Sequence, residues 1–381
     1  MAESVRVLRV IARMNVGGPA WQSSVLTRGL PAYGIETRLL AGRVGVDEED
    51  FVVLRDPDLP VTIVEGLGRS VRVGGDLRAF AALVREIREF RPDIIHTHTA
   101  KAGVLGRLAA IVCRVPVRVH TFHGHLLRGY FSSGVSQLVR LAERVLARQT
   151  TALVSVGRLV RDELVAAGIE RSHQWTPIAP GVAPSDSVSG VEARRATGLP
   201  VGAPVVLFVG RLTAVKRFDR LLEAFGLVLQ EVPEALLVVV GQGEEIEKVL
   251  LAAAPFGESV RLLGWRSDLA NLYGSADLVV ISSDNEGMPV TLIEAAMAGV
   301  PGVTTNAGSA SEVVEHGVTG LVVDLDGEKL AQGIVELLQD HDRRRNMGEA
   351  AARRAKQRFG SERLVLDHVG LYRSLLEPQQ P

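Results

Sequence analysis

Short apolar runs alternate with longer amphipathic segments along the whole chain. In the first half the apolar runs of strand length are 5–11, 94–96, 117–121 and 152–156, and helical spacing is clear in segments such as 77–90. The alternation restarts at 204–210 and continues at 236–241, 260–263, 278–282, 302–305 and 321–323. Alternating strand and helix signals are typical of parallel sheets with crossover helices. We therefore predict an α/β protein with two doubly wound, Rossmann-like domains.

The predicted domains are separated by a segment rich in Pro, Ser, Gly and Ala. We predict an N-terminal domain at 1–183, a linker at 184–203 and a C-terminal domain at 204–360, followed by a helix and tail at 361–381 that can cross back to the first domain. Ligands of open α/β sheets bind beyond the carboxyl ends of the strands. We therefore expect the chemistry in a cleft between two facing domains.

Composition narrows the class of protein. The apolar content of 46% over 381 residues indicates a globular protein, and the single cysteine, Cys113, excludes an internal disulfide framework. Charges interrupt the apolar N-terminus, and no run approaches the roughly 18 apolar residues of a spanning helix. We expect a cytoplasmic protein with no nucleic-acid partner.

The formal charge of −1 conceals an asymmetry between the two halves. Residues 1–190 carry 24 Lys and Arg against 18 Asp and Glu, and the remainder carries 19 against 26. A basic first half fits an anionic partner such as a lipid phosphate, although solvated arginines explain it equally well.

A charged loop follows the first strand of the second domain. In residues 210–216, Arg211 and Lys216 leave the carboxyl end of that strand after Gly210, ahead of a helix expected near Phe218. A guanidinium fork and a mobile ammonium group suit a diphosphate. The alternative is a pair of solvated surface charges.

A second loop carries two carboxylates, Glu286 and Glu294, where a strand gives way to a helix. Free amides near Val290 and Thr291 at the start of that helix can hold phosphate oxygens. The alternative is a capping box formed by Thr291 and Glu294, which leaves Glu286 unexplained.

Histidines gather at the ends of two strands of the first domain, at positions 96, 98, 120, 123 and 125. Imidazole is a common zinc ligand, but no Asp or Glu stands close by in either segment to complete such a site. We interpret these histidines as polar lining of the cleft and expect no metal ion.

Two other motifs favour turns. Gly241 and Gly243 follow a strand, but Ile246 occupies the place of the third glycine of a dinucleotide fingerprint, which argues against NAD. Residues 324–326 contain two aspartates between a strand and a helix, so we predict a turn there rather than a metal site.

A basic stripe recurs every four residues at Arg140, Arg144 and Arg148 on a predicted helix. We place apolar residues on the opposite face of this helix, namely Leu138, Leu141, Val145 and Leu146. Such a stripe can rest on an anionic membrane or be an ordinary solvated face. It is our candidate for the approach of a lipid-linked acceptor.

Together these motifs resemble a known enzyme family. Gly210, Arg211 and Lys216, the Glu286 to Glu294 spacing, and segments 307–314 and 316–323 resemble the donor domain of family 4 retaining glycosyltransferases, which have the GT-B fold. Residues 14–20 resemble the first glycine loop of that family, and 119–125 resemble its histidine motif. Segment 178–184 departs from the common pattern, because the family's acid is missing there.

The resemblance implies that residues 1–183 form the acceptor-side domain and residues 204–360 the nucleotide-sugar donor domain. It also implies a role for each matching residue. Arg211 and Lys216 would bind the donor diphosphate, Glu286 the donor sugar, Glu294 the ribose hydroxyls, and His123 the sugar near its C6 hydroxyl. The catalytic candidates are Arg211, Lys216, His123 and Glu286. The donor-binding candidates are Gly17, Gly18, Gly210, Gly264, Trp265, Arg266, Gly287, Met288, Pro289, Val290, Thr291 and Glu294.

The implied reaction is transfer of a hexose-type sugar from a nucleotide diphosphate donor to a hydroxyl acceptor, with retention and without a metal or other cofactor. Bacterial envelope glycolipid or polysaccharide biosynthesis is the expected setting. Two alternatives stay open, a nucleotide-sugar 2-epimerase of the same architecture and a non-catalytic nucleotide-sugar-binding partner. The sequence does not indicate the base, the sugar or the acceptor.

Overall fold

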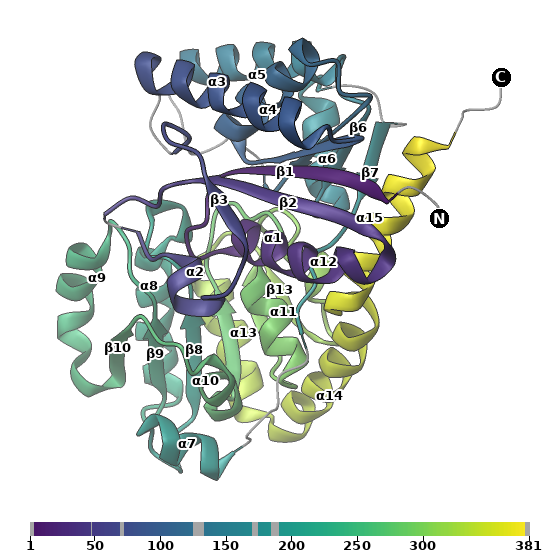
Figure 1. Ribbon diagram of the computed structural model, residues 1–381. Coiled ribbons are helices and arrows are strands. Elements are labelled where there is room, and N and C mark those ends of the chain that lie inside the picture. The colour runs from purple at the N-terminus through teal and green to yellow at the C-terminus, as the bar shows by residue number, and fades with distance from the viewer. Residues whose placement is uncertain are drawn as a thin grey trace. The chain divides into compact units, whose positions relative to one another are not determined.

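The computed structural model describes residues 4–46, 48–68, 72–124, 133–169, 174–183 and 190–377. Two compact units divide the chain. The first contains Met1–Gly181 together with Ser361–Pro381, and the second contains Val182–Gly360. Figure 1 shows the ribbon of each unit, with a parallel sheet and its surrounding helices.

The first unit is built on a seven-stranded parallel sheet. Its strands are β1 (Val5–Arg13), β2 (Ile35–Gly42), β3 (Val61–Ile63), β4 (Ile94–His98), β5 (Val117–Phe122), β6 (Ala152–Ser155) and β7 (Trp175–Pro177), in the spatial order β3-β2-β1-β4-β5-β6-β7. The four predicted strands are confirmed. Strand β2 carries Glu36 and Arg38 among its apolar residues, and β3 has only three residues, so neither gives a clear apolar run.

Helices cover both faces of this sheet. They are α1 (Gly18–Gly29), α2 (Phe51–Arg55), α3 (Val73–Phe90), α4 (Ala100–Val112), α5 (Ser133–Ala147), α6 (Arg158–Ala166) and α15 (Ser361–Leu376), with a 3₁₀ turn at Leu30–Tyr33. Side chains of β1 alternate between the two faces: Leu8 packs with Leu83 of α3, whereas Val7 packs with Leu26 of α1.

The C-terminal helix α15 belongs to the first unit. Its buried side chains pack in the same cluster as Val7 and Leu26, and they are Leu364, Val365, Val369 and Tyr372. At the start of the helix, Arg363 Nη2 donates to the carbonyl oxygens of Ala179 and Pro180, both at 2.8 Å. The helix therefore completes the core of a domain whose other elements lie at least about 180 residues earlier in the chain.

The second unit repeats the architecture with a six-stranded parallel sheet. Its strands are β8 (Val205–Val209), β9 (Leu236–Val240), β10 (Val260–Gly264), β11 (Leu278–Ile281), β12 (Gly302–Thr305) and β13 (Gly320–Val323), in the spatial order β10-β9-β8-β11-β12-β13. The six predicted strands are confirmed. Almost every strand residue is buried or partly buried, as expected for a parallel sheet covered on both faces.

Ten helical segments accompany this sheet within the described residues of the second unit. They are α7 (Val191–Thr197), α8 (Phe218–Glu231), α9 (Ile246–Ala253), α10 (Leu269–Ser275), α11 (Val290–Met297), α12 (Ala310–Val313), α13 (Gly327–Gln339) and α14 (His341–Arg358), with 3₁₀ turns at Ala214–Lys216 and Ala254–Ser259. Helix α8 begins at Phe218, as predicted. Helices α8 and α13 pack against one another and share one apolar core with the sheet.

The segment predicted as a linker contains structure. Residues 184–189 lie outside the described residues, but helix α7 follows them and packs against α10. Arg194 of α7 pairs with Asp277 at 2.6 Å and donates to the carbonyl oxygen of Ser275. Because polar contacts anchor α7, apolar periodicity did not reveal it, and this part of the chain belongs to the second unit.

The packing of α15 on α1 gives a test of stability. A Cβ atom on Gly29 would lie 2.4 Å from Val365 Cγ2, whereas a Cβ on Gly370, also in α15, would meet no atom within 4 Å. We expect Gly29→Ala to lower the free energy of unfolding by about 1–3 kcal/mol. Gly370→Ala should raise it by roughly 0.5–1 kcal/mol, since alanine favours helices. Urea unfolding followed by circular dichroism measures both, and equal effects would contradict the described packing.

Candidate functional site

Each sheet has a point where the strand order reverses. In the second unit this point lies between β8 and β11, and in the first unit between β1 and β4. Crevices for ligands form beyond the carboxyl ends of strands at such points. The loops after β8 and β11 contain Gly210, Arg211, Lys216 and residues 286–289, so the structure brings this group of predicted residues to one edge of one sheet.

Backbone and side-chain hydrogen bonds join these two loops. The Asp284 amide donates to the carbonyl oxygen of Val215 at 3.0 Å, and Ser282 Oγ donates to that of Lys216 at 2.8 Å. Arg220, nearly buried on α8, pairs with Asp284 at 2.7 Å and donates to the Ser282 carbonyl oxygen. The loop after β8 is therefore fixed against the loop after β11.

Arg217 adds a second cation to this junction. Its backbone is left-handed, with φ of 49°, and its guanidinium pairs with Asp284 and Asp219. The hydrogen bonds that its guanidinium donates to Asp219 and to Asp284 raise the pKa of Arg217. Burial acts to raise the pKa of Asp284, but hydrogen bonds from Arg217 and Arg220 outweigh it and lower that pKa. Sequence reasoning missed all of these residues, because charged residues beside a loop carry no signal of their partners.

Lys216 and Glu286 form an ion pair. Lys216 Nζ lies 2.6 Å from Glu286 Oε1, and Ser283 Oγ donates to the same oxygen at 2.5 Å. The Glu286 side chain is only 9% exposed and that of Lys216 is 22% exposed. Two residues that were predicted for different parts of a donor are thus in direct contact, each one positioning the other.

Helix α11 begins without a side-chain cap. Pro289 is its N-cap residue, Thr291 Oγ1 donates to the carbonyl oxygen of Val209 at 3.1 Å, and Glu294 accepts from the hydroxyl of Tyr273 at 2.7 Å. The capping-box alternative is therefore wrong: Thr291 ties the helix to the end of β8. The amides of Leu292 and Ile293 donate to the carbonyl oxygen of Pro289. The two amides before them, of Val290 and Thr291, have no partner within the helix and are the ones that can hold an anion.

Two glycines allow close approach between backbones around these loops. A Cβ on Gly308, whose φ is +51°, would lie 1.9 Å from the carbonyl oxygen of Glu286, and one on Gly241 would lie 1.9 Å from that of Gly210. The Gly241 turn therefore packs on the loop after β8, in agreement with the interpretation as a turn. Asp326 caps helix α13 by accepting from the amide of Lys329, which confirms a turn at 324–326.

Gly264 is the last residue of β10, and Trp265 and Arg266 follow it; β9 lies between β10 and β8 in the sheet. The Gly264 carbonyl oxygen accepts from the amide of Gly241 at 2.8 Å, and Arg266 pairs with Asp268 at 2.7 Å. These residues lie at the same carboxyl edge of the sheet as the Lys216 to Glu286 pair.

The remaining predicted residues lie in the first unit. Gly17 and Gly18 follow β1 at the reversal of strand order, and α1 begins at Gly18 with Pro19 in its first turn. The amide of Trp21 donates to the Gly17 carbonyl oxygen at 3.1 Å and closes that turn. His123 follows β5 directly.

Histidines fill the carboxyl end of β4 and its neighbours. His96, His98 and His120 are fully buried, and burial, aided by neighbouring cationic groups, lowers the pKa of each well below its ordinary value. Burial lowers the pKa of His123 to about 3 and that of His368 on α15 to about 4. All five are therefore neutral near pH 7. Across the described ranges no three His, Cys, Asp or Glu side chains could share a metal ion, and His125 lies outside those ranges.

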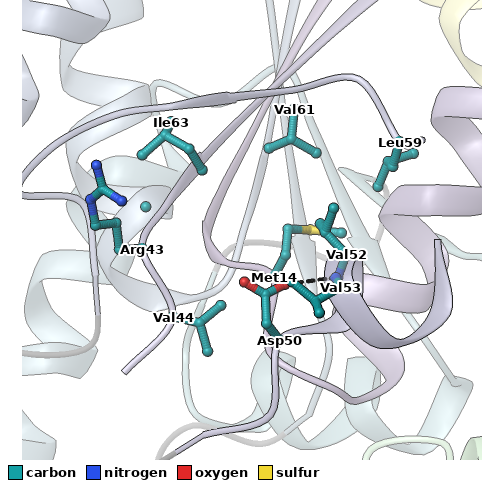
Figure 2. Close-up of a pocket in the computed structure, with 10 residues that line it drawn as sticks. Met14, Arg43, Val44, Asp50, Val52, Val53, Leu59, Val61 and Ile63 are labelled. Carbon is teal, nitrogen blue, oxygen red and sulfur yellow. Dashed lines mark hydrogen bonds between the residues drawn. The ribbon is translucent and has the colours of Figure 1, made fainter. Parts of the chain in front are cut away.

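A separate pocket of about 380 Å³ lies beside the ends of β2 and β3. Figure 2 shows aliphatic side chains such as Val44, Val61 and Ile63 around it. Its two charged lining residues are engaged, because Arg43 pairs with Glu65 and Asp50 caps α2 through the amide of Val52. The pocket therefore lacks the positive charge that a diphosphate needs, and no predicted donor residue is among those that line it.

The arginine stripe of α5 differs from the prediction. Leu141 and Val145, predicted for the face opposite the arginines, are 58% and 55% exposed, and Arg144 and Arg148 are exposed as well. Leu146, also predicted for that face, is buried, and the side chain of Leu138 lies outside the described residues. The buried face of α5 instead contains Glu143, which pairs with Arg107 of α4 at 2.6 Å. The buried ion pair turns the helix so that aliphatic and cationic side chains share its outer surface.

Comparison with solved structures identifies the fold. Two doubly wound units in tandem match solved structures over almost the whole chain. The HepE protein of Anabaena, solved with UDP-glucose, aligns with a TM-score of 0.80 at 23% identity, covering 97% of this chain and 99% of that one. A sucrose-phosphate synthase from Thermosynechococcus elongatus gives 0.81 at 21% identity, with 97% and 99% covered. The architecture is the predicted GT-B fold.

The chain belongs to the glycosyltransferases of family 4 type. Residues 191–354 match the family Glycosyl transferases group 1, and residues 17–181 match the Glycosyl transferase 4-like domain. The chain is 30% identical to a D-inositol 3-phosphate glycosyltransferase of Xylanimonas cellulosilytica, covering 91% of this chain and 89% of the relative. It is 26% identical to a galactosyltransferase of Escherichia coli that is named for GlcNAc-diphosphoundecaprenol, covering 75% and 76%. The prediction of a glycosyltransferase is confirmed, and the epimerase alternative finds no support.

The buried histidines predict how stability depends on pH. Their pKa values are lower in the folded protein than the ordinary value near 6.5, so the unfolded chain binds more protons as the pH falls. Each histidine should reduce the free energy of unfolding by up to about 1.4 kcal/mol per pH unit below pH 6.5. We expect steep loss of stability between pH 7 and 5, above the range where carboxylates titrate, and a smaller slope in His368→Leu. Urea unfolding at several pH values measures this, and a flat profile would contradict neutral buried histidines.

Proposed function

We propose that the protein transfers a hexose-type sugar from a nucleotide diphosphate sugar to a hydroxyl acceptor, with retention at the anomeric carbon. The observation that carries the proposal is the Lys216 to Glu286 ion pair at the reversal of strand order, beside the uncapped start of α11. Two relatives support a setting in the biosynthesis of bacterial envelope polysaccharides or glycolipids: one from Staphylococcus aureus is named for capsular polysaccharide biosynthesis, and the Escherichia coli galactosyltransferase is named for GlcNAc-diphosphoundecaprenol. Metal assistance is not part of the proposed mechanism.

In this mechanism the cations act on the leaving group. As the bond between the anomeric carbon and the diphosphate oxygen breaks, negative charge grows on that oxygen, and Lys216, Arg211 and the first amides of α11 stabilise it. The hydroxyl oxygen of the acceptor forms the new bond on the same face, and its proton passes to a phosphate oxygen of the leaving group. The reaction described in this way requires no nucleophile from the protein.

The carboxylates orient the donor. Glu286, held by Lys216 and Ser283, accepts hydrogen bonds from hydroxyl groups of the sugar. Glu294 accepts hydrogen bonds from the hydroxyl groups of the ribose. Tyr273, which the sequence did not single out, holds Glu294 through its hydroxyl. His123 binds the sugar near C6, Gly17 and Gly18 allow backbone approach to the diphosphate, and Trp265 and Arg266 approach the base.

We also propose that the outer surface of α5 contacts an anionic membrane that carries the acceptor. Leu141 and Val145 are exposed four residues apart on the same side of α5, and Arg148 is exposed directly after the helix ends at Ala147. Helix α4, which packs against α5, exposes Leu108 and Val112. Aliphatic residues with flanking arginines suit the interface of an anionic bilayer. None of the described helices is both long enough and apolar enough to span a bilayer.

Replacing Lys216 tests the proposed catalysis. A thermal shift panel of UDP, GDP and ADP sugars first selects the donor, because a bound ligand raises stability. With that donor, Lys216→Met should reduce the rate of sugar transfer by roughly 10²–10³-fold, and Lys216→Arg should retain more activity. Lys248→Met, which removes an exposed lysine on α9, is the matched control.

Nuclear magnetic resonance of the product gives the anomeric configuration, which should equal that of the donor. Full activity of folded Lys216→Met would contradict the role of the lysine. An inverted product would contradict retention. Donor binding without turnover across an acceptor panel would favour the non-catalytic alternative.

Vesicle sedimentation tests the membrane contact. The protein should bind vesicles containing phosphatidylglycerol more tightly than pure phosphatidylcholine vesicles, and salt should weaken the binding, since each basic residue near the surface contributes about 1 kcal/mol. Replacing Leu141, Val145 and Arg148 together by glutamine should abolish the difference. Replacing Leu250 and Leu251, which are exposed on α9, is the matched control. If the triple variant and the control variant bind the phosphatidylglycerol vesicles equally well, the assignment of this surface is overturned.

A further inference from the structure

His98 contacts His123 in the interior of the first unit. Its Nδ1 atom lies 3.1 Å from Nε2 of His123, so one of these nitrogens donates a hydrogen bond and the other accepts it. His98 is fully buried at the end of β4, and His123 is partly exposed just after β5. The direction of this hydrogen bond decides whether the second nitrogen of His123, Nδ1, can donate to a ligand or accept from it.

The other nitrogen of His98 indicates the direction. Within the described part of the chain, His98 Nε2 is buried and has no hydrogen-bond partner. If His123 donated, neutral His98 would carry its proton on Nε2 and bury an N–H group without an acceptor. If His98 donates, Nε2 is an unprotonated acceptor instead. Buried N–H groups without a partner are rarer than buried acceptors without one, so donation by His98 is favoured.

Two neighbouring histidines show the same arrangement. His368 Nδ1 faces the carbonyl oxygen of Leu364 at 2.8 Å, and a carbonyl can only accept, so the proton is on Nδ1. His120 Nδ1 faces Thr97 Oγ1 at 2.8 Å, and that hydroxyl can itself donate to the Val119 carbonyl oxygen. In both histidines Nε2 is buried and lacks a partner among the described residues. This interior therefore tolerates an unprotonated Nε2 without a donor.

The ring of His98 is also held in place. His96 stacks on it with ring centroids 4.3 Å apart. His96 in turn is bonded at both nitrogens, to the hydroxyl of Tyr372 at 2.6 Å and to that of Thr121 at 2.7 Å. Burial keeps His98 and His123 neutral, so the hydrogen bond between them involves a single proton.

We propose that His98 is a positioning residue that donates its Nδ1 proton to His123 Nε2 and thereby fixes the His123 proton on Nδ1. His123 then presents a hydrogen-bond donor, not an acceptor, to an oxygen of the bound sugar. The identity of that ligand rests on the proposed function, whereas the position of the proton does not. No other group is needed to choose the tautomer.

Nitrogen-15 magnetic resonance of the histidine-labelled full chain tests the proton position without a ligand. We expect protonated Nδ1 and unprotonated Nε2 in His123. His98→Leu should remove this preference, and His98→Asn should keep it, because the asparagine amide can place an N–H where Nδ1 lies. His120→Leu is the matched control, since His120 is buried one strand away and bonds to Thr97. A proton on Nε2 of His123 in the native chain overturns the inference.

Sugar transfer provides the second measurement. His98→Leu should lower kcat by about tenfold, the effect of one lost hydrogen bond, with unchanged affinity for the free nucleotide diphosphate, and His98→Asn should restore most of the rate. Equal loss in both variants with an unchanged His123 tautomer overturns the positioning role. The expected tautomer in a chain that transfers no sugar would instead overturn the proposed function and leave the hydrogen bond standing.

Discussion

The ion pair between Lys216 and Glu286 is the interaction on which the candidate donor site depends. A carboxylate that is almost buried is costly unless an opposite charge and a hydrogen-bond donor accompany it, and Lys216 and Ser283 supply both. The pair joins the loops after β8 and β11, which the parallel sheet brings together where its strand order reverses. Charge is thereby placed before any ligand arrives, which is what electrostatic catalysis requires.

The first unit has a polar interior whose hydrogen bonds hold its elements in place. Arg9 in β1 is fully buried, burial lowers its pKa to about 10, and its guanidinium donates to Thr37, Thr27 and the carbonyl oxygen of Ser23. These bonds fix α1 on the sheet, and the hydrogen bond between His96 and Tyr372 fixes α15. A network of buried hydrogen bonds allows few arrangements of its side chains, so we expect the surroundings of His123 to be rigid.

The repeated apolar runs were enough to predict two parallel sheets, since buried strands leave a strong local signal. The charged loops were predicted because they follow such strands. The sequence did not predict the partners of the charged residues, because topology alone decides which side chains meet. Examples are the hydrogen bond from Tyr273 to Glu294 and the ion pair between Arg220 and Asp284. Helix α7 and the outer surface of α5 were misassigned for the same reason, since Arg194 and Glu143 bind groups on other elements.

The central claim is that the second unit binds the donor diphosphate through the loops after β8 and β11. Hydrogen-deuterium exchange with and without UDP measures this directly, because bound phosphate protects the amides that it contacts. UDP is the nucleotide found in the solved HepE complexes. The account predicts protection concentrated in residues 210–217 and 282–294, including the first turn of α11. Protection confined to the pocket lined by Val44, Val61 and Ile63, with these loops unchanged, would contradict it.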